Sequence, residues 1–386
     1  MQHNKATRRK FLGASGAVGS LLFAGCISSG SSDSNQEPTE NSTPTSSQET
    51  TTDDTYTVSI EPVGDVEFDG PPEQWTALLP TFADMGFALG GGQTLGIQNH
   101  HRYANEAFDA LPGLEHDQDE IVELVSGNVD KELFYEMNAE AHFIDPHILR
   151  LWYDWDQSDI DEVRSNIGPL FGSFIRRHSD KWHDYRYYDL YEAFALMADV
   201  FQAQDRYEAF VDLHDQMLDT IDKRLPPADQ RPTALLVYPA GKNGTSFYPF
   251  RINNGGVSTK QWRDLGLSDA LAETDVGHYS YSDDGTLGPE ALVEIDPEAL
   301  LVRNYGGTPE SEFQKNVVKP LKENSVTSRI TAVENDEIYN AGYLDQGPII
   351  NFYHTDQAAK DIYPDAFEGA TLFDRERIAE IVSGNV

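Results

Sequence analysis

The stretch LGPEALVEIDPEALLV, residues 287–302, places a helical pattern directly before a strand pattern. Residues 289–293 predict a helix, and the apolar run at 299–302 predicts a buried strand. Further out, strands are expected at 233–238 and helices at 259–265 and 310–321. A strand pair is expected at 330–333 and 337–339, and closing helices at 349–362 and 374–382. Alternation of this kind favours an α/β fold, with a parallel sheet covered by helices on both faces.

The first half of the chain shows the same alternation. The expected strands are 56–60, 63–68, 75–79 and 141–144, and the expected helices are 80–89, 120–125, 131–137 and 187–201. The predicted hairpin at 56–68 alternates only weakly, which suits the edge of a sheet. We therefore expect two α/β lobes, residues 56–204 and residues 226–386.

A long helix is expected between these lobes, at residues 205–225. Its apolar positions recur at helical spacing from Phe210 to Ile221, Asp205 and Glu208 form a capping-box pattern, and Pro226 and Pro227 end it. At 1.5 Å per residue, the stretch 206–224 measures about 28 Å, enough to cross from one lobe to the other. His214 lies on its apolar stripe and is expected to be a core residue.

Two similar nonapeptides occur far apart, IVELVSGNV at 121–129 and IAEIVSGNV at 378–386. Both fit a short amphipathic helix stopped by glycine. We interpret them as two such helices and not as a structural repeat.

The charge balance argues against several classes of function. Lys and Arg number 28 against 65 Asp and Glu, for a formal charge of −37. Binding to nucleic acid, or to an anionic membrane through a basic patch, needs the opposite sign. An acid excess of this size suggests a halophilic protein, because concentrated salt shortens the reach of charge repulsion to about 3 Å at 1 M. The single cysteine excludes intramolecular disulfides and CxxC zinc sites.

The N-terminal residues predict export and attachment to the cell surface. Residues 1–25 combine basic residues around Arg8 and Arg9 with an apolar stretch too short to span a bilayer, and TRRKFL resembles a twin-arginine signal. LFAGC, ending at Cys26, resembles a lipobox, in which the thiol is lipidated; an ordinary buried thiol is the alternative. Residues 27–55 lack Lys, Arg and aromatic residues, so 26–55 is expected to be a disordered tether. A lipid-anchored protein on the extracellular face of the membrane is predicted.

Recognised catalytic motifs are missing. The sequence contains no HExxH, GxSxG or P-loop pattern, and GGGQTLG at 90–96 has the spacing GxGxxxG, one residue longer than a dinucleotide fingerprint. Histidines could bind a metal in two places. One set is His100, His101 and His116, and the other is His142 and His147 with Asp145.

Aromatic residues and arginines follow the predicted strands of both lobes. Ligands of open α/β sheets bind beyond the carboxyl ends of the strands, so these residues are expected to face one cleft. Aromatic rings offer contact area at low entropy cost, and arginine binds oxyanions in a bidentate manner. The candidate ligand-binding residues are Arg102, Tyr103, Trp152, Tyr153, Trp155, Arg176, Arg177, Tyr248, Phe250, Arg251, Tyr279, Tyr281, Tyr305 and Tyr343. For each of them, a core aromatic residue or a surface arginine is the alternative.

From Trp75 to Val386 the chain resembles ABC-transporter solute-binding proteins of the iron-siderophore and cobalamin type. The similar segments are WTALLPTFADMGFALG (75–90), GNVDKE (127–132) with 141–145, LGPEAL (287–292) with DPEALLV (296–302), and AVENDEIY (332–339). The resemblance implies two sandwiched α/β lobes joined by one long helix. It also implies that one glutamate on each lobe binds arginines of the membrane permease. The matching residues are Glu132 and Glu290, which could also be plain acids in the first turn of a helix.

These observations predict a receptor without enzymatic activity or resident cofactor, working as a monomer. It would capture a metal chelate such as an iron(III)-siderophore, which both lobes would contact, and deliver it to an ABC importer. A free metal-ion receptor using the histidines remains open. So do an exported metal-dependent enzyme and a surface interaction protein without a small ligand. The sequence does not distinguish siderophore, cobalamin and haem.

Overall fold

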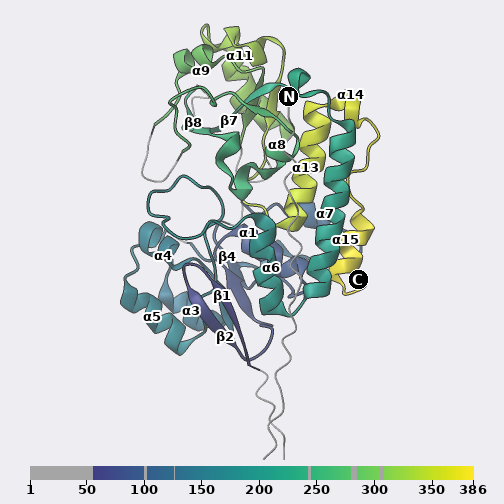
Figure 1. Ribbon diagram of the computed structural model, residues 1–386. Helices are drawn as coiled ribbons and strands as arrows, with labels where there is room; N and C mark the ends of the chain where they lie inside the picture. The colour runs from purple at the N-terminus through teal and green to yellow at the C-terminus, as the bar shows by residue number, and fades with distance from the viewer. Residues whose placement is uncertain (1–54, 100–101, 126, 242–244, 280–284, 304–307) are drawn as a thin grey trace, which may run out of the picture. The chain divides into compact units, whose positions relative to one another are not determined.

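The computed structural model describes residues 55–99, 102–125, 127–241, 245–279, 285–303 and 308–386 (Figure 1). The predicted signal, Cys26 and nearly all of the predicted tether lie outside these ranges, as do His100, His101, Tyr281 and Tyr305. Among the described residues, no helix combines the length and the apolar character that crossing a lipid bilayer requires.

The first lobe contains short paired strands surrounded by helices. β1 (Tyr56–Ile60) and β2 (Gly64–Phe68) form an antiparallel hairpin, β3 (Trp75–Ala77) pairs in parallel with β6 (Ala141–Phe143), and β4 (Gly96–Ile97) pairs in parallel with β5 (Val122–Glu123). The helices are α1 (Pro80–Ala88), α2 (Asn105–Asp109), α3 (Lys131–Met137), α4 (Pro146–Tyr153), α5 (Gln157–Asn166) and α6 (Leu190–Phe201). The predicted helices at 80–89 and 131–137 are confirmed.

The helix predicted at 120–125 is wrong. Residues 122–123 form β5, whose backbone pairs with Gly96 and Ile97 of β4. Ile121 and Leu124 are buried in the lobe. The backbone hydrogen bonds with β4 therefore take the place of helical ones, in spite of the helical spacing of the apolar residues. The related segment at 378–386 begins within α15 (Arg375–Val382), as predicted.

The long helix expected between the lobes is α7 (Gln204–Arg224), which runs from the end of α6 toward the second lobe (Figure 1). Its apolar face buries Phe210, Met217 and Ile221, and His214 is also buried, as expected. The predicted capping box is wrong, because the helix starts at Gln204 after Ala203, with no side-chain cap. A capping box is present in α6 instead, between Asp189 and Glu192.

The second lobe is built on a mostly parallel sheet in the order β11-β10-β7-β8, with β9 paired to β7. Its strands are β7 (Thr233–Pro239), β8 (Phe247–Phe250), β9 (Ser268–Asp269), β10 (Ala299–Val302) and β11 (Ile338–Asn340). Its helices are α8 (Lys260–Asp264), α9 (Pro289–Ile295), α10 (Glu310–Phe313), α11 (Lys319–Glu323) and α12 (Thr331–Glu334). The strand predicted at 330–333 is wrong, because α12 occupies it and only 338–340 joins the sheet. The α/β class is confirmed.

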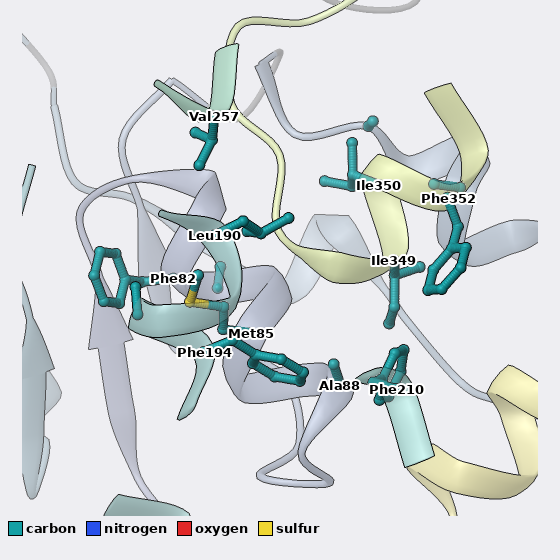
Figure 2. Packing of buried hydrophobic residues seen from close by; sticks show 14 of the residues in the cluster. Phe82, Met85, Ala88, Leu190, Phe194, Phe210, Val257, Ile349, Ile350 and Phe352 are labelled. Carbon is teal, nitrogen blue, oxygen red and sulfur yellow. The ribbon is translucent and has the colours of Figure 1, made fainter. Parts of the chain in front are cut away.

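The closing helices connect the two lobes. α13 (Pro348–Ile362) packs against α1 and α2 of the first lobe and against α8 of the second, while α15 packs against α7. Figure 2 shows Ile349 and Phe352 of α13 close to Phe210 of α7 and Ala88 of α1. α14 (Pro364–Phe367) follows α13. One hydrophobic core therefore runs from the first lobe, through α7 and α13, to one face of the second sheet.

Candidate functional site

A segment of the first lobe without regular helix or strand contacts the second lobe. We call this segment, residues 171–188, the strap. Its backbone accepts hydrogen bonds from the second lobe, from Val257 N to Ile175 O (3.0 Å) and from Ser258 N to Arg176 O (3.1 Å). Gly256 makes this approach possible, because a Cβ there would lie 2.3 Å from Arg176 O. The strap therefore holds the loop at 254–258 directly against the first lobe.

The adjacent arginines of the strap are buried and form ion pairs. Arg176 donates to both carboxylate oxygens of Asp345, at 2.7 Å each, and Arg177 donates to both oxygens of Asp180, at 2.6 and 3.0 Å. Both arginines are 4% exposed. Buried charges persist only where they are paired in this way. The Arg176 pair thus joins the strap to the segment that precedes α13, whereas the Arg177 pair lies within the strap.

Several predicted ligand-binding residues lie together around these arginines. Arg176 stacks on Trp152 (5.6 Å), and Arg177 stacks on Tyr279 (5.6 Å). Tyr279 in turn contacts Tyr248 (4.7 Å) and Phe250 (5.7 Å), measured between ring centroids. The structure therefore brings together residues from three distant parts of the sequence. Trp152, Tyr248 and Tyr279 are half-buried, while Phe250 is in the core.

The other predicted residues are placed separately. Tyr103 packs against Phe108 (4.9 Å) in the core of the first lobe, and Trp155 packs against Phe134 (5.5 Å) and donates to Val129 O. Tyr153 is half-buried and donates to Gln98, and Arg102 is also half-buried. Arg251 donates to the backbone carbonyls of Val276 and Thr274. Tyr103 and Trp155 therefore do not belong to the cluster around the strap.

A cavity of about 330 Å³ is lined by residues other than those of this cluster. It is lined by the residues that follow β10 and β11 at their carboxyl ends, by α8 and α13, and by Glu106 of α2 from the first lobe. Arg303 connects it to the aromatic cluster, since its guanidinium donates to Tyr343 O and stacks on Phe250 (5.1 Å). This is the region where open α/β sheets bind ligands.

Tyr343 is the predicted residue that lines this cavity. Its ring stacks on His354 at 5.5 Å, and its hydroxyl donates to Glu106 Oε2 at 3.1 Å. Burial, and then the charge of Arg303, lower the pKa of His354 to about 3, so this imidazole is neutral near pH 7. The cavity wall thus combines a neutral imidazole, tyrosine rings and carboxylates.

Sequence reasoning missed most of this cavity. Glu106, Gln261, Trp262, His354 and Asp361 line it but belong to three different helices. Nothing in their sequence context distinguishes them from ordinary helical residues. The one available signal was position, because the residues around Tyr343 follow a predicted strand.

The histidine sets considered for a metal are not assembled in the described part of the chain. His142 is buried and contacts Thr76 Oγ1 (2.7 Å), and burial lowers its pKa to about 4. His147 Nδ1 lies 3.3 Å from the Asp145 carboxylate, and His116 stacks on Phe108 (4.4 Å). Among the described residues, no group of three or more His, Cys, Asp or Glu side chains could hold a metal ion.

The two glutamates predicted to contact a permease occupy equivalent positions. Glu132 lies in the first turn of α3, and Glu290 lies in the first turn of α9. Both side chains belong to exposed residues. Carboxylates at these positions complement the positive end of the helix dipole. Glu132 and Glu290 are thus both exposed first-turn glutamates, the former on the first lobe and the latter on the second.

Comparison with known proteins gives a consistent result. A family model described as "Periplasmic binding protein" matches residues 145–342, slightly more than half of the chain. No curated protein matches significantly. Similar solved structures include a periplasmic binding protein from Veillonella parvula, with a TM-score of 0.60 and 15% identity over 80% of this chain and 98% of that one.

Two further structures have titles that mention iron. The iron uptake ABC transporter substrate-binding protein PiuA from Streptococcus pneumoniae has a TM-score of 0.53 and 15% identity, over 80% of this chain and 97% of that one. A protein of an ABC-type Fe3+-hydroxamate transport system from Saccharomonospora viridis has a TM-score of 0.54 and 19% identity, over 80% and 99%. At these identities the likeness concerns the fold.

Proposed function

This chain belongs to the periplasmic binding protein family, whose members bind solutes and are not enzymes, and on that premise we propose that it captures a metal chelate outside the cytoplasm and delivers it to an ABC importer. The observation that carries this proposal is the cavity at the carboxyl ends of β10 and β11, which Glu106 closes from the first lobe. A ligand there would touch both lobes. Iron(III)-siderophores are the proposed class, since two similar structures are described by iron uptake and Fe3+-hydroxamate transport.

The half-buried aromatic residues supply the proposed contact surface. Trp152, Tyr153, Tyr248 and Tyr279 lie around the strap and can pack on the apolar body of a chelate. We keep half-buried Arg102 in this set, together with Tyr281 and Tyr305, which lie outside the described residues. We propose that Arg176 and Arg177 do not contact the ligand, and that they act indirectly by holding the strap against the second lobe.

A binding screen tests the ligand class. The chain without residues 1–25, carrying Cys26→Ser, would be heated in molar KCl with ferric hydroxamates, ferric catecholates, ferric citrate-type chelates, cobalamin, haem and free divalent metals. A ligand at 100 times its dissociation constant adds about 2.7 kcal/mol, which should raise the unfolding midpoint by a few degrees. A shift with one chelate class supports the proposal. A shift with free metals alone contradicts it and favours an ion receptor.

Docking to a permease is proposed for Glu132 and Glu290. Replacing both by arginine should abolish uptake of the bound chelate while leaving its affinity unchanged, because neither residue lines the cavity. The matched control is Glu136→Arg with Glu294→Arg, which changes exposed glutamates further along the same two helices. Equal loss of uptake in both double variants would show a general charge effect and contradict the docking role.

Anchoring at the extracellular face of the membrane is proposed through lipidated Cys26 and a tether, residues 26–55. A Cys26→Ala variant should appear in the culture medium, while the unchanged chain stays with the membrane fraction. Retention of the variant in the membrane fraction would contradict the anchor. The proposed receptor works as a monomer, as light scattering of the soluble form can check.

A further inference from the structure

Resting on the function proposed above, we infer that the chelate carries a positively charged side arm, and that Glu106, Glu310 and Asp361 hold this arm in the cavity beside Tyr343. The ligand would then be cationic, such as a ferric tris-hydroxamate with a free terminal ammonium group. A cavity of about 330 Å³ suits such a side arm.

The first observation is the charge of the cavity wall. Glu106, Glu310 and Asp361 line it, and its described lining contains no Lys or Arg. Desolvation, and then the negative charge of Glu310, raise the pKa of Asp361, which shows that these two carboxylates interact. An ammonium group between them would relieve this repulsion, whereas a carboxylate or catecholate would add to it.

The second observation comes from polar groups buried in the same wall. Gln261 Nε2, Trp262 Nε1 and His354 Nδ1 have no hydrogen-bond partner within the described structure, although these residues are only 0%, 3% and 8% exposed. Unpaired buried polar groups are costly, and a ligand is one explanation for them. The amide and indole N–H groups can only donate, so they fit carbonyl or hydroxamate oxygens.

The third observation concerns the arginines that would bind an anionic chelate. Arg176 and Arg177 donate to Asp345 and Asp180, and Arg251 and Arg303 donate to backbone carbonyls. These hydrogen bonds hold the four side chains within the protein, and none of the four lines the cavity. An anionic ligand in the cavity would meet carboxylates without a neighbouring guanidinium in the described lining.

A matched pair of chelates tests this inference. The probes are a ferric tris-hydroxamate with a free terminal amine and the same chelate N-acetylated, titrated against the tryptophan fluorescence of the Cys26→Ser chain from residue 26 onward. We expect the ammonium form to bind about tenfold more tightly, the effect of one charge-assisted hydrogen bond. Glu310→Gln and Asp361→Asn should each lower this ratio, and Glu312→Gln, an exposed change on the same helix outside the cavity, should keep it.

Equal affinities for the two probes, or tighter binding of the acetylated form, would overturn the inference and leave the chelate receptor standing. Tighter binding of an anionic ferric citrate-type chelate than of the ammonium form would do the same. Absence of binding by every metal chelate would instead overturn the proposed function, and this inference with it. Circular dichroism of each variant ensures that a lost preference does not reflect unfolding.

Discussion

Asp84 is a buried carboxylate that links the first lobe to α13. It accepts hydrogen bonds from Ile349 N (3.1 Å) and Ile350 N (2.9 Å), at the positive end of that helix. Burial nevertheless raises its pKa to about 7, because the backbone donors compensate only part of the lost hydration. The buried carboxyl group of Asp84 therefore titrates near neutral pH.

This raised pKa predicts a pH dependence of stability. The folded chain binds a proton at Asp84 that the unfolded chain releases above its ordinary pKa of 3.8, so the resulting stabilisation is complete below pH 3.8 and is lost as the pH rises to about 7. The full difference is at most about 4 kcal/mol. Urea unfolding at pH 5 and pH 8 should show a smaller pH difference for Asp84→Asn than for the unchanged chain. Asp65→Asn, at an exposed residue, is the control. If Asp84→Asn showed the same stability difference between pH 5 and pH 8 as the unchanged chain, this explanation would be contradicted.

The ion pair between Arg176 and Asp345 should matter for stability far more than a surface pair. Asp345→Asn leaves the Arg176 charge buried without its partner and should cost about 3–5 kcal/mol in urea unfolding. The double variant R176M/D345L removes both charges and should recover much of that loss. Glu380→Gln, which breaks a largely exposed pair with Arg377, should cost less than about 1 kcal/mol. A similar small cost for Asp345→Asn would contradict the structural role of this pair.

At the scale of elements, the strap and the loop at 254–258 depend on each other. Two backbone hydrogen bonds join them, and Gly256 provides the space for this contact. Arg263 donates to the carbonyls of Gly255 and Gly256 and so holds the loop from the second lobe. The aromatic residues of the cluster thus come from α4, from β8 and from the loop at Tyr279, and the contact between strap and loop brings these elements together.

Gly256→Ala tests this dependence. The new methyl group would lie 2.3 Å from Arg176 O and 2.4 Å from Arg177 Cα, so the backbone of the strap or of the loop must move. We expect a loss of about 1–3 kcal/mol in unfolding free energy, as overpacking typically causes. Gly277→Ala has no atom within 4 Å of the new methyl and should be nearly neutral. Equal stability of the two variants would show that the contact is looser than described.

At the scale of the whole described body, α7 is not the only connection between the lobes. α13 packs against both of them, and one hydrophobic core continues across the junction. Rotation of one lobe against the other would have to separate this packing, in addition to the buried ion pair of Arg176. Large hinge motion therefore carries a high cost.

Ligand binding should accordingly cause little closure. Small-angle X-ray scattering of the soluble form, with and without the chelate found in the screen, should show almost the same radius of gyration. The Asp345→Asn variant is a useful comparison, since it loses one connection between the strap and the segment that leads into α13. A marked compaction of the unchanged chain on ligand addition would contradict this prediction.

The fold was largely predictable from the sequence, and the candidate site was predictable only in part. Helices with a clear apolar stripe and end signals, such as α7 before Pro226, were placed within about two residues. Tyr343 was found because it follows a predicted strand. Glu106, Gln261, Trp262 and His354 were not, because their common location arises from the packing of α2, α8 and α13.

The nonapeptides at 121–129 and 378–386 show which features the sequence decided and which ones the tertiary structure decided. The sequence by itself determined the α/β alternation, the linking helix and the acidic composition, since each depends on local periodicity or on residue counts. The tertiary structure alone decided that IVEL at 121–124 contributes a strand while IAEIV at 378–382 is helical. It likewise decided that Arg176 pairs with Asp345. The physical reason is that backbone hydrogen bonds and buried charges are satisfied by whichever partner the fold brings near, and sequence neighbours do not identify that partner.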